Sequence, residues 1–181
     1  MTLPEFVGFP KMSRLNRTCI VTEKIDGTNA QIFIADDFET ILFGSRTKWI
    51  TPEDDNYGFA RWGTENKAEL LKLGPGQHFG EWWGAGIQRR YGLTEKRFSL
   101  FNATRWADDA VRPKCCHVVP VLAQHTDIRV ATESALTLLR EKGSIAAPGF
   151  MKPEGVVIFH TASGQLFKVT LEKDESRKSE I

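Results

Sequence analysis

The segment EKIDGTN at residues 23–29 places a lysine between a short apolar run, residues 19–21, and a glycine turn. Two carboxylates and an amide flank Lys24 in this segment. A lysine in such a position can be desolvated, lose its proton and act as a covalent nucleophile. The pattern alone is weak, because an exposed lysine beside a type I′ turn at Asp26-Gly27 has the same sequence. The downstream sequence therefore has to decide between these two interpretations.

Composition sets the number of domains and the compartment. The chain has 181 residues, of which 41% are hydrophobic, so we predict one domain over residues 1–181. A formal net charge of +1 gives no global attraction to nucleic acid. Three cysteines, two of them adjacent, predict neither a disulfide framework nor a zinc site, which favours a reducing, cytoplasmic location. The sequence shows no signal peptide and no apolar run of membrane-spanning length, so we expect no membrane partner.

Strand-like segments dominate the chain. We predict strands at residues 18–22, 28–35, 40–45, 77–82, 97–101, 118–123, 155–160 and 165–171. Apolar residues at helical spacing predict two helices, at residues 64–73 and 132–142, which end at Gly74 and Gly143. Strands joined by turns, with helices irregularly placed among them, predict an antiparallel α+β domain.

The last two predicted strands form a hairpin whose pairing can be worked out. Residues 162–164 (ASG) suit a three-residue loop with Gly164 in the left-handed position. This loop would place Lys168 opposite Ile158, on the face that also carries Glu154. The two charged side chains would then lie about 13 Å apart, at roughly 3.3 Å per residue, within reach of one nucleotide-sized ligand. A solvated glutamate and lysine on an outer face would look the same.

Six segments then follow one another in a recognisable order. They are EKIDGTN (23–29), GSRT (44–47), FGEWWG (79–84), RFSLFN (97–102), PEGVVI (153–158) and LFKV (166–169). In this order and spacing the chain resembles the covalent nucleotidyltransferase superfamily of polynucleotide ligases and capping enzymes, and within it the RNA ligase 2-like and RNA-editing ligase branch. The resemblance implies an ATP-grasp-like nucleotidyltransferase domain of mostly antiparallel sheets with flanking helices.

The resemblance implies a lysine–AMP phosphoramidate, which needs an amine in line with the α-phosphate and cations that neutralise the leaving pyrophosphate. Lys24 would be the nucleophile. Lys168 and a Mg²⁺ or Mn²⁺ ion would favour its neutral form and stabilise charge on the α-phosphate. Glu154 would be the metal ligand, because hard divalent cations prefer carboxylates together with water and phosphate oxygens.

The resemblance also implies which side chains bind the nucleotide. Glu81 would accept hydrogen bonds from the ribose hydroxyls, and Arg46 would contact ribose or phosphate. Phe101 would stack on the purine, with Phe98 in its place if the strand presents its other face. Two positions of the nucleophile segment complete the set: Glu23, where the family reads the adenine amino group, and Asn29, an amide used at the sealing step.

Each of these residues has an ordinary structural alternative. Glu81, beside two tryptophans, could be a carboxylate at a strand end, and Arg46 could be a surface arginine. Phe98 and Phe101 would be core residues in most proteins. Two basic pairs bracket a loop after Glu81 and could follow nucleic-acid phosphates, although such clusters are usually solvated surface: Arg89-Arg90 and Lys96-Arg97.

The chain departs from the family pattern in two ways. The fifth segment usually carries lysine, any residue, lysine, but here Thr170 follows Lys168, and Lys173 is a possible replacement. Only residues 171–181 follow, so we expect neither the OB-fold domain of DNA ligases and capping enzymes nor the helical domain of RNA ligases. The chain would then be a minimal catalytic module or a truncated one.

The predicted function is an ATP- and Mg²⁺-dependent RNA ligase. It would join RNA ends that carry a 5′-phosphate and a 3′-hydroxyl. ATP is favoured over NAD because only 23 residues precede Lys24, too few for the extra domain of NAD-using relatives. The alternatives are a DNA nick-sealing ligase, a guanylyltransferase, and a nucleotide- or RNA-binding module that keeps the fold without turnover.

Overall fold

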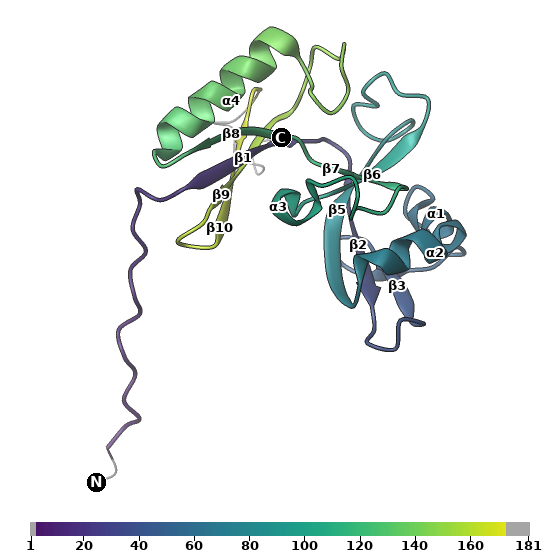
Figure 1. Ribbon diagram of the computed structural model, residues 1–181, viewed down its shortest axis with the longest axis horizontal. Coiled ribbons are helices and arrows are strands. Elements are labelled where there is room, and N and C mark those ends of the chain that lie inside the picture. The colour runs from purple at the N-terminus through teal and green to yellow at the C-terminus, as the bar shows by residue number, and fades with distance from the viewer. Residues whose placement is uncertain (1–2, 173–181) are drawn as a thin grey trace, which may run out of the picture.

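Two mainly antiparallel sheets, joined by residues 25–27, form the body of the protein in a computed structural model that describes residues 3–172 (Figure 1). The smaller sheet has the order β10-β9-β1-β8, with β1 (Cys19–Lys24), β8 (Val121–His125), β9 (Gly155–His160) and β10 (Gln165–Thr170). The larger has the order β4-β3-β2-β5-β6-β7, with β2 (Thr28–Ile34), β3 (Ile41–Gly44), β4 (Trp49–Ile50), β5 (Gly76–Gly84), β6 (Lys96–Leu100) and β7 (Cys116–Val118). Only the β6–β7 pair is parallel among the described strands. The predicted α+β class is confirmed.

Alternating burial along β1 decides which face carries the lysine. Cys19 and Val21 are fully buried and pack with β9 and with helix α4 (Ile128–Lys142), which covers that face of the smaller sheet (Figure 1). Successive side chains of a strand point to opposite faces. Lys24, three positions after Val21, therefore lies on the face that α4 leaves uncovered.

Helix α4 begins at Ile128 rather than at the predicted residue 132. Asp127 explains the earlier start, because its side chain accepts a hydrogen bond from the backbone N–H of Arg129 at 2.8 Å and so caps the first turn. The helix ends at Gly143, as predicted, where the backbone turns to a φ of 74°.

The predicted helix at 64–73 is the second half of a broken helical segment: α1 (Phe59–Glu65), α2 (Lys67–Leu70) and a 3₁₀ turn, η1 (Leu71–Leu73). Its first turn packs on the larger sheet through aromatic rings. Phe59 and Trp62 lie against Trp82 and Phe98, with ring centroids 5.0 to 5.8 Å apart. The prediction followed aliphatic spacing and so missed the aromatic turn that starts the segment.

The predicted strand at 118–123 is two strands, β7 and β8, which belong to different sheets. Pro120 separates them, because proline has no N–H to donate to a ladder. Its carbonyl accepts a hydrogen bond from the N–H of Glu23 at 3.0 Å. The prediction also missed two short elements, strand β4 and helix α3 (Ala103–Trp106).

The predicted pairing of the last hairpin is wrong by one residue. His160 pairs with Gln165, so the loop has four residues, and Lys168 lies opposite Val157 rather than Ile158. Gly164 does adopt the left-handed conformation, with a φ of 68°, but its N–H bonds to the carbonyl of His160 at 2.9 Å and closes a longer loop. A shift of one residue moves every side chain to the other face. Lys168 therefore shares a face with Lys24.

Ahead of β1, the chain runs away from both sheets as an extended arm (Figure 1). Its apolar side chains, such as Phe6 and Phe9, are exposed and join neither sheet's core. Within residues 3–172, no helix combines the length and the apolar character that crossing a bilayer demands.

Candidate functional site

The loop that joins the two sheets, residues 25–27, directly follows the proposed nucleophile Lys24, and we refer to it as the nucleophile loop. Ile25 is buried in a cluster with Trp83 and Tyr91 at the junction of the sheets. Gly27 lies so close to β5 that an added Cβ would sit 2.4 Å from the carbonyl oxygen of Trp82. Because β1 and β2 belong to different sheets, Asp26-Gly27 is not the turn of a hairpin. The alternative interpretation, an exposed lysine beside a type I′ hairpin turn, is therefore wrong.

Lys24 and Glu154 form an ion pair at this loop. The Lys24 Nζ lies 2.7 Å from the Glu154 Oε2, and the two side chains are 24% and 17% exposed. Lys24 pairs across the sheet with Gly155, the residue after Glu154. The lysine thus points at a carboxylate in a partly open site and not into bulk solvent.

Glu81 connects β5 to the nucleophile loop. It is only 7% exposed, its Oε1 accepts from the N–H of Gly27 at 3.0 Å, and its Oε2 accepts from the side chain of Asn29 at 2.9 Å. Burial raises the pKa of Glu81 from 4.5 to about 7, against these two hydrogen bonds and the charge of Lys24, which lower it. The negative charge of Glu154 also raises this pKa, so Glu81, Glu154 and Lys24 are close enough to interact electrostatically.

This raised pKa gives the protein a testable pH dependence. The folded state binds the Glu81 proton more tightly than the unfolded state does, so stability falls as the pH rises from about 4.5 to about 7. We expect the free energy of unfolding, taken as wild type minus Glu81→Gln, to fall by about 3 kcal/mol over that range. Urea titrations at several pH values measure this difference. A difference that stays constant with pH would show that Glu81 is ionised normally.

Glu23 lies on the α4 side of β1 and is 1% exposed. Its Oε2 accepts from the backbone N–H groups of Ile145 and Ala146 at 2.8 and 2.9 Å, which fastens the segment after α4 to β1. Burial raises the pKa of Glu23. Its Oε1 is buried and has no hydrogen-bond partner within 3.5 Å among residues 3–172, although the nearby Ser144 hydroxyl lowers the pKa of this carboxylate.

The fifth segment lies along the edge strand β10. Lys168 is exposed and lies in one cross-strand row with Val157, whereas Thr170 lies in the row of Gly155 and Lys24. The Thr170 hydroxyl donates to the carbonyl of Glu172 at 2.9 Å. Both positions of the segment thus share the face of Lys24. The suggested replacement, Lys173, lies outside the described residues.

The two phenylalanines have separate positions. Phe98 is fully buried against Phe59, so the interpretation of Phe98 as the stacking residue is wrong. Phe101 follows β6, bonds through its N–H to the carbonyl of Phe79 at 2.9 Å, and is 43% exposed, as a stacking surface requires. Arg46 is exposed in the turn after β3 and forms no ion pair with any residue from 3 to 172. The structure does not bring Arg46 into contact with Lys24, Glu81 or Glu154.

The basic pairs after Glu81 are mostly committed to contacts within the protein. Arg89 pairs with Asp26, Arg97 pairs with Glu95, and the Lys96 Nζ donates to the carbonyl of Tyr57 at 2.7 Å. Arg89 and Tyr91, whose hydroxyl accepts from the N–H of Asp26 at 2.8 Å, belong to the surroundings of the nucleophile loop. The sequence did not predict this role for either residue. The sequence feature that pointed to Arg89 and Tyr91 was the polar loop bounded by glycines that follows the segment FGEWWG (79–84).

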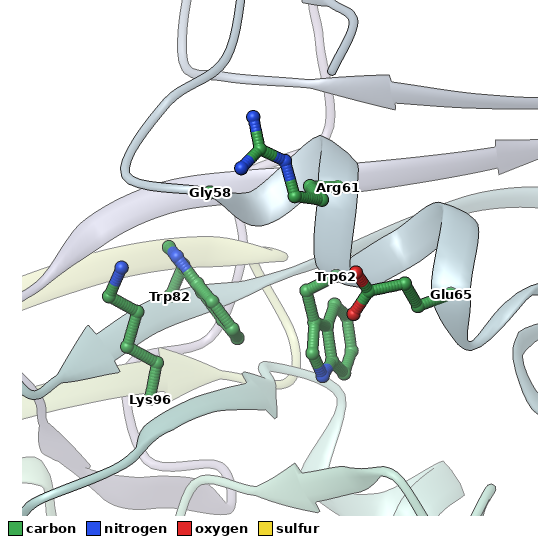
Figure 2. Close-up of a pocket in the computed structure, with 6 residues that line it drawn as sticks. All are labelled: Gly58, Arg61, Trp62, Glu65, Trp82 and Lys96. Atoms are coloured by element: carbon green, nitrogen blue, oxygen red, sulfur yellow. The ribbon is translucent and has the colours of Figure 1, made fainter.

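A surface hollow of about 360 Å³ (Figure 2) lies beside Trp82, whose side chain points to the face of β5 opposite that of Glu81. It is lined by Gly58, Arg61, Trp62, Glu65, Trp82 and Lys96. The indoles of Trp62 and Trp82 have centroids 5.0 Å apart, and Trp62 also stacks on Phe59, so no slot remains for a base between the rings. None of the residues assigned to nucleotide or metal binding lines this hollow, and Lys96 is the one member of the two basic pairs that does.

The comparisons with known proteins identify the fold as that of a covalent nucleotidyltransferase-type ligase. The family model described as RNA ligase matches residues 17–170, and the chain therefore belongs to the RNA ligase family. This confirms the family predicted from the sequence segments. A search of curated proteins gave no significant match.

Solved structures of Naegleria gruberi RNA ligase share the fold. An apo variant gives a TM-score of 0.63 at 20% identity and covers 97% of this chain and 60% of that one. A variant with ATP and Mn gives a TM-score of 0.62 at 20% identity, with the same two coverages. The structure with PPi gives a TM-score of 0.58 at 20% identity, again covering 97% and 60%. The chain thus spans about three fifths of the length of these proteins.

Proposed function

We propose that the chain is the adenylation domain of an ATP-dependent RNA ligase. Lys24 takes AMP from ATP as a covalent lysyl-AMP, the AMP passes to a 5′-phosphate RNA end, and a 3′-hydroxyl then attacks that end to seal it. The observation that carries the proposal is the position of Lys24, with its Nζ 2.7 Å from Glu154 and beside the buried Glu81.

The first step requires a neutral amine at Lys24. The Nζ gives up one proton to solvent and attacks the α-phosphorus, a nitrogen–phosphorus bond forms, the bond to the bridging oxygen breaks, and pyrophosphate leaves. The nitrogen then gives up a second proton to solvent and becomes the neutral phosphoramidate. The Glu154 carboxylate lies within hydrogen-bond reach and orients the Nζ from the β9 side. The two hydrogen bonds of Glu81 hold the loop that follows Lys24.

A divalent metal ion fits this site through Glu154. Residues 3–172 contain no group of three or more His, Cys, Asp or Glu side chains that could hold a metal alone. A single carboxylate suits Mg²⁺ or Mn²⁺, because such ions take most of their ligands from water and substrate phosphates. When bound, the ion would neutralise charge on the phosphates of ATP.

The remaining nucleotide contacts are assigned by position. Each Glu81 oxygen has one protein donor and keeps a lone pair for a ribose hydroxyl. Phe101 offers an exposed ring for the purine, and Lys168 places a positive charge on the face of Lys24. The other contacts are proposed for Glu23 with the adenine amino group, Asn29 at the sealing step and Arg46 with ribose or phosphate.

The complexes of the similar structures support the choice of ATP. Structures of Naegleria gruberi RNA ligase were solved with ATP and Mn, with AMP and Mn, and with PPi. ATP is the substrate of lysine adenylation, AMP is the part of it that the lysine retains, and PPi is the part that is released. We therefore propose ATP together with Mg²⁺ or Mn²⁺ as the ligands of this chain.

We expect incubation with α-labelled ATP and Mg²⁺ to leave on the wild-type protein a covalent label that survives denaturation and alkali and is lost in acid, as a phosphoramidate requires. Lys24→Ala should leave no label, because the methyl group cannot attack phosphorus. The label is measured on denaturing gels, and mass spectrometry of the labelled peptide locates it. Lys11→Ala, in the exposed arm, is the matched control and should label normally. An unlabelled wild type, or a label that survives in Lys24→Ala, would refute the proposed function.

Thr170 favours one second candidate, a nucleotide-binding module without turnover. Its hydroxyl stands where the family carries a second lysine, and it supplies no positive charge. ATP binding without pyrophosphate release would favour this candidate. Parallel sealing assays on nicked RNA and nicked DNA duplexes separate the RNA ligase from a DNA ligase.

A further inference from the structure

The loop between β5 and β6 is held in a strained conformation. Gln88, Arg90 and Tyr91 have φ values of 43°, 59° and 51°, in a region that non-glycine residues rarely adopt. Tyr91 is 2% exposed and packs between Trp83 and Phe150, at centroid distances of 4.9 and 4.7 Å. Burial of this ring fixes the loop, and strain maintained in this way often serves a function.

This loop presents Arg89 to both halves of the candidate site. The Arg89 Nε donates to the Asp26 Oδ2 at 3.0 Å, two residues after Lys24. Its Nη1 donates to the carbonyl of Lys152 at 3.0 Å, two residues before Glu154. Arg89 thus joins the same two segments that the Lys24–Glu154 ion pair joins.

The two connections differ in what happens to them during adenylation. The Lys24–Glu154 ion pair is lost when the Nζ gives up its proton and bonds to phosphorus. The Arg89 guanidinium keeps its charge throughout, because arginine is always protonated in proteins. Its bonds to Asp26 and Lys152 therefore do not depend on the protonation state of Lys24.

We propose that Arg89 is a positioning residue for lysine adenylation, which rests on the function proposed above. It holds the nucleophile loop against the segment that precedes β9 while Lys24 reacts. A role in tracking RNA phosphates fits the geometry less well, because the guanidinium is already neutralised by Asp26. The fixed, planar fork of arginine also presents separate nitrogens to a carboxylate and a carbonyl at once, whereas the three donors of a lysine radiate from a single nitrogen.

The test compares Arg89→Ala with Arg90→Ala, its exposed neighbour, which forms no ion pair among residues 3–172. Single-turnover labelling with ATP contains no RNA, so any RNA contact of Arg90 has no effect on it. We expect Arg89→Ala to lower the maximal rate about 30-fold while the half-saturating ATP concentration changes by less than about threefold. Added ethylguanidinium should restore part of the rate of Arg89→Ala and leave Arg90→Ala unchanged.

Hydrogen exchange gives a readout that does not need activity. We expect the amides of residues 25–28 to exchange faster in Arg89→Ala than in the wild type, and at the wild-type rate in Arg90→Ala. If Arg89→Ala does not fold, Arg89→Lys is measured instead, and its maximal rate should still be reduced. This variant keeps the charge near Asp26 and loses the second bond.

Two results would overturn the positioning role. One is a maximal rate in the Arg89 variant equal to that of the wild type. The other is a higher half-saturating ATP concentration at an unchanged maximal rate, which would make Arg89 a phosphate contact. A wild-type protein that takes no label rejects the proposed function instead, and in that case hydrogen exchange still decides whether Arg89 holds the loop.

Discussion

Replacing Glu154 with glutamine is expected to slow lysine adenylation about 100-fold, equivalent to about 2.7 kcal/mol of barrier. The substitution keeps the size of the side chain and removes its charge. The amide is a poor ligand for Mg²⁺ and no longer pairs with Lys24, whose Nζ lies 2.7 Å away. Stability should change by less than about 1 kcal/mol, because both side chains are partly exposed and such pairs contribute little. Single-turnover labelling and urea unfolding measure the two effects separately.

The matched control is Glu133→Gln, which removes a glutamate of α4 that pairs with Arg140 at 3.9 Å. Its rate of labelling should equal that of the wild type. If the slow step of Glu154→Gln reflects metal binding, a higher Mg²⁺ or Mn²⁺ concentration should recover part of the rate. A Glu154→Gln protein that labels at the wild-type rate would show that Glu154 neither orients the lysine nor holds a metal.

Gly27→Ala is expected to destabilise the protein by about 3 kcal/mol and to abolish detectable labelling. The new Cβ would lie 2.4 Å from the carbonyl oxygen of Trp82 and 2.7 Å from the Cβ of Trp83, so the loop has to move away from β5. That movement breaks the hydrogen bond from the Gly27 N–H to Glu81 and leaves a buried carboxylate oxygen without its donor. Thermal and urea unfolding measure the stability, and labelling with ATP measures the activity.

Gly8→Ala is the control for this substitution. An added Cβ at Gly8 would find its nearest neighbour at 3.9 Å, on the ring of Phe6, so stability and labelling should not change. If Gly27→Ala unfolds at the wild-type midpoint and labels normally, the close approach of the loop to β5 has no role in placing Lys24.

Local patterns predicted much of the fold because the relevant interactions lie close together in the chain. The alternation of apolar residues in β2 reports burial of one face of that strand against the core of the larger sheet. Gly143 ends α4 as predicted, since a helix terminus depends on its own last turn. The predictions failed where distant groups decided the outcome. Pro120 divides two strands between two sheets, and one loop residue reverses the face of Lys168.

For the candidate site, the sequence by itself predicted the nucleophile segment and the glutamates at positions 81 and 154, and it identified the family that the family model confirms. Their order and chemistry are carried by short, continuous segments. Only the tertiary structure decided that Glu154 pairs with Lys24 and that Phe98 is buried while Phe101 is exposed. It also decided that Arg89 bonds to Asp26 in the nucleophile loop. These contacts join residues as many as 130 positions apart. Their geometry follows from the packing of two sheets, which no local pattern encodes.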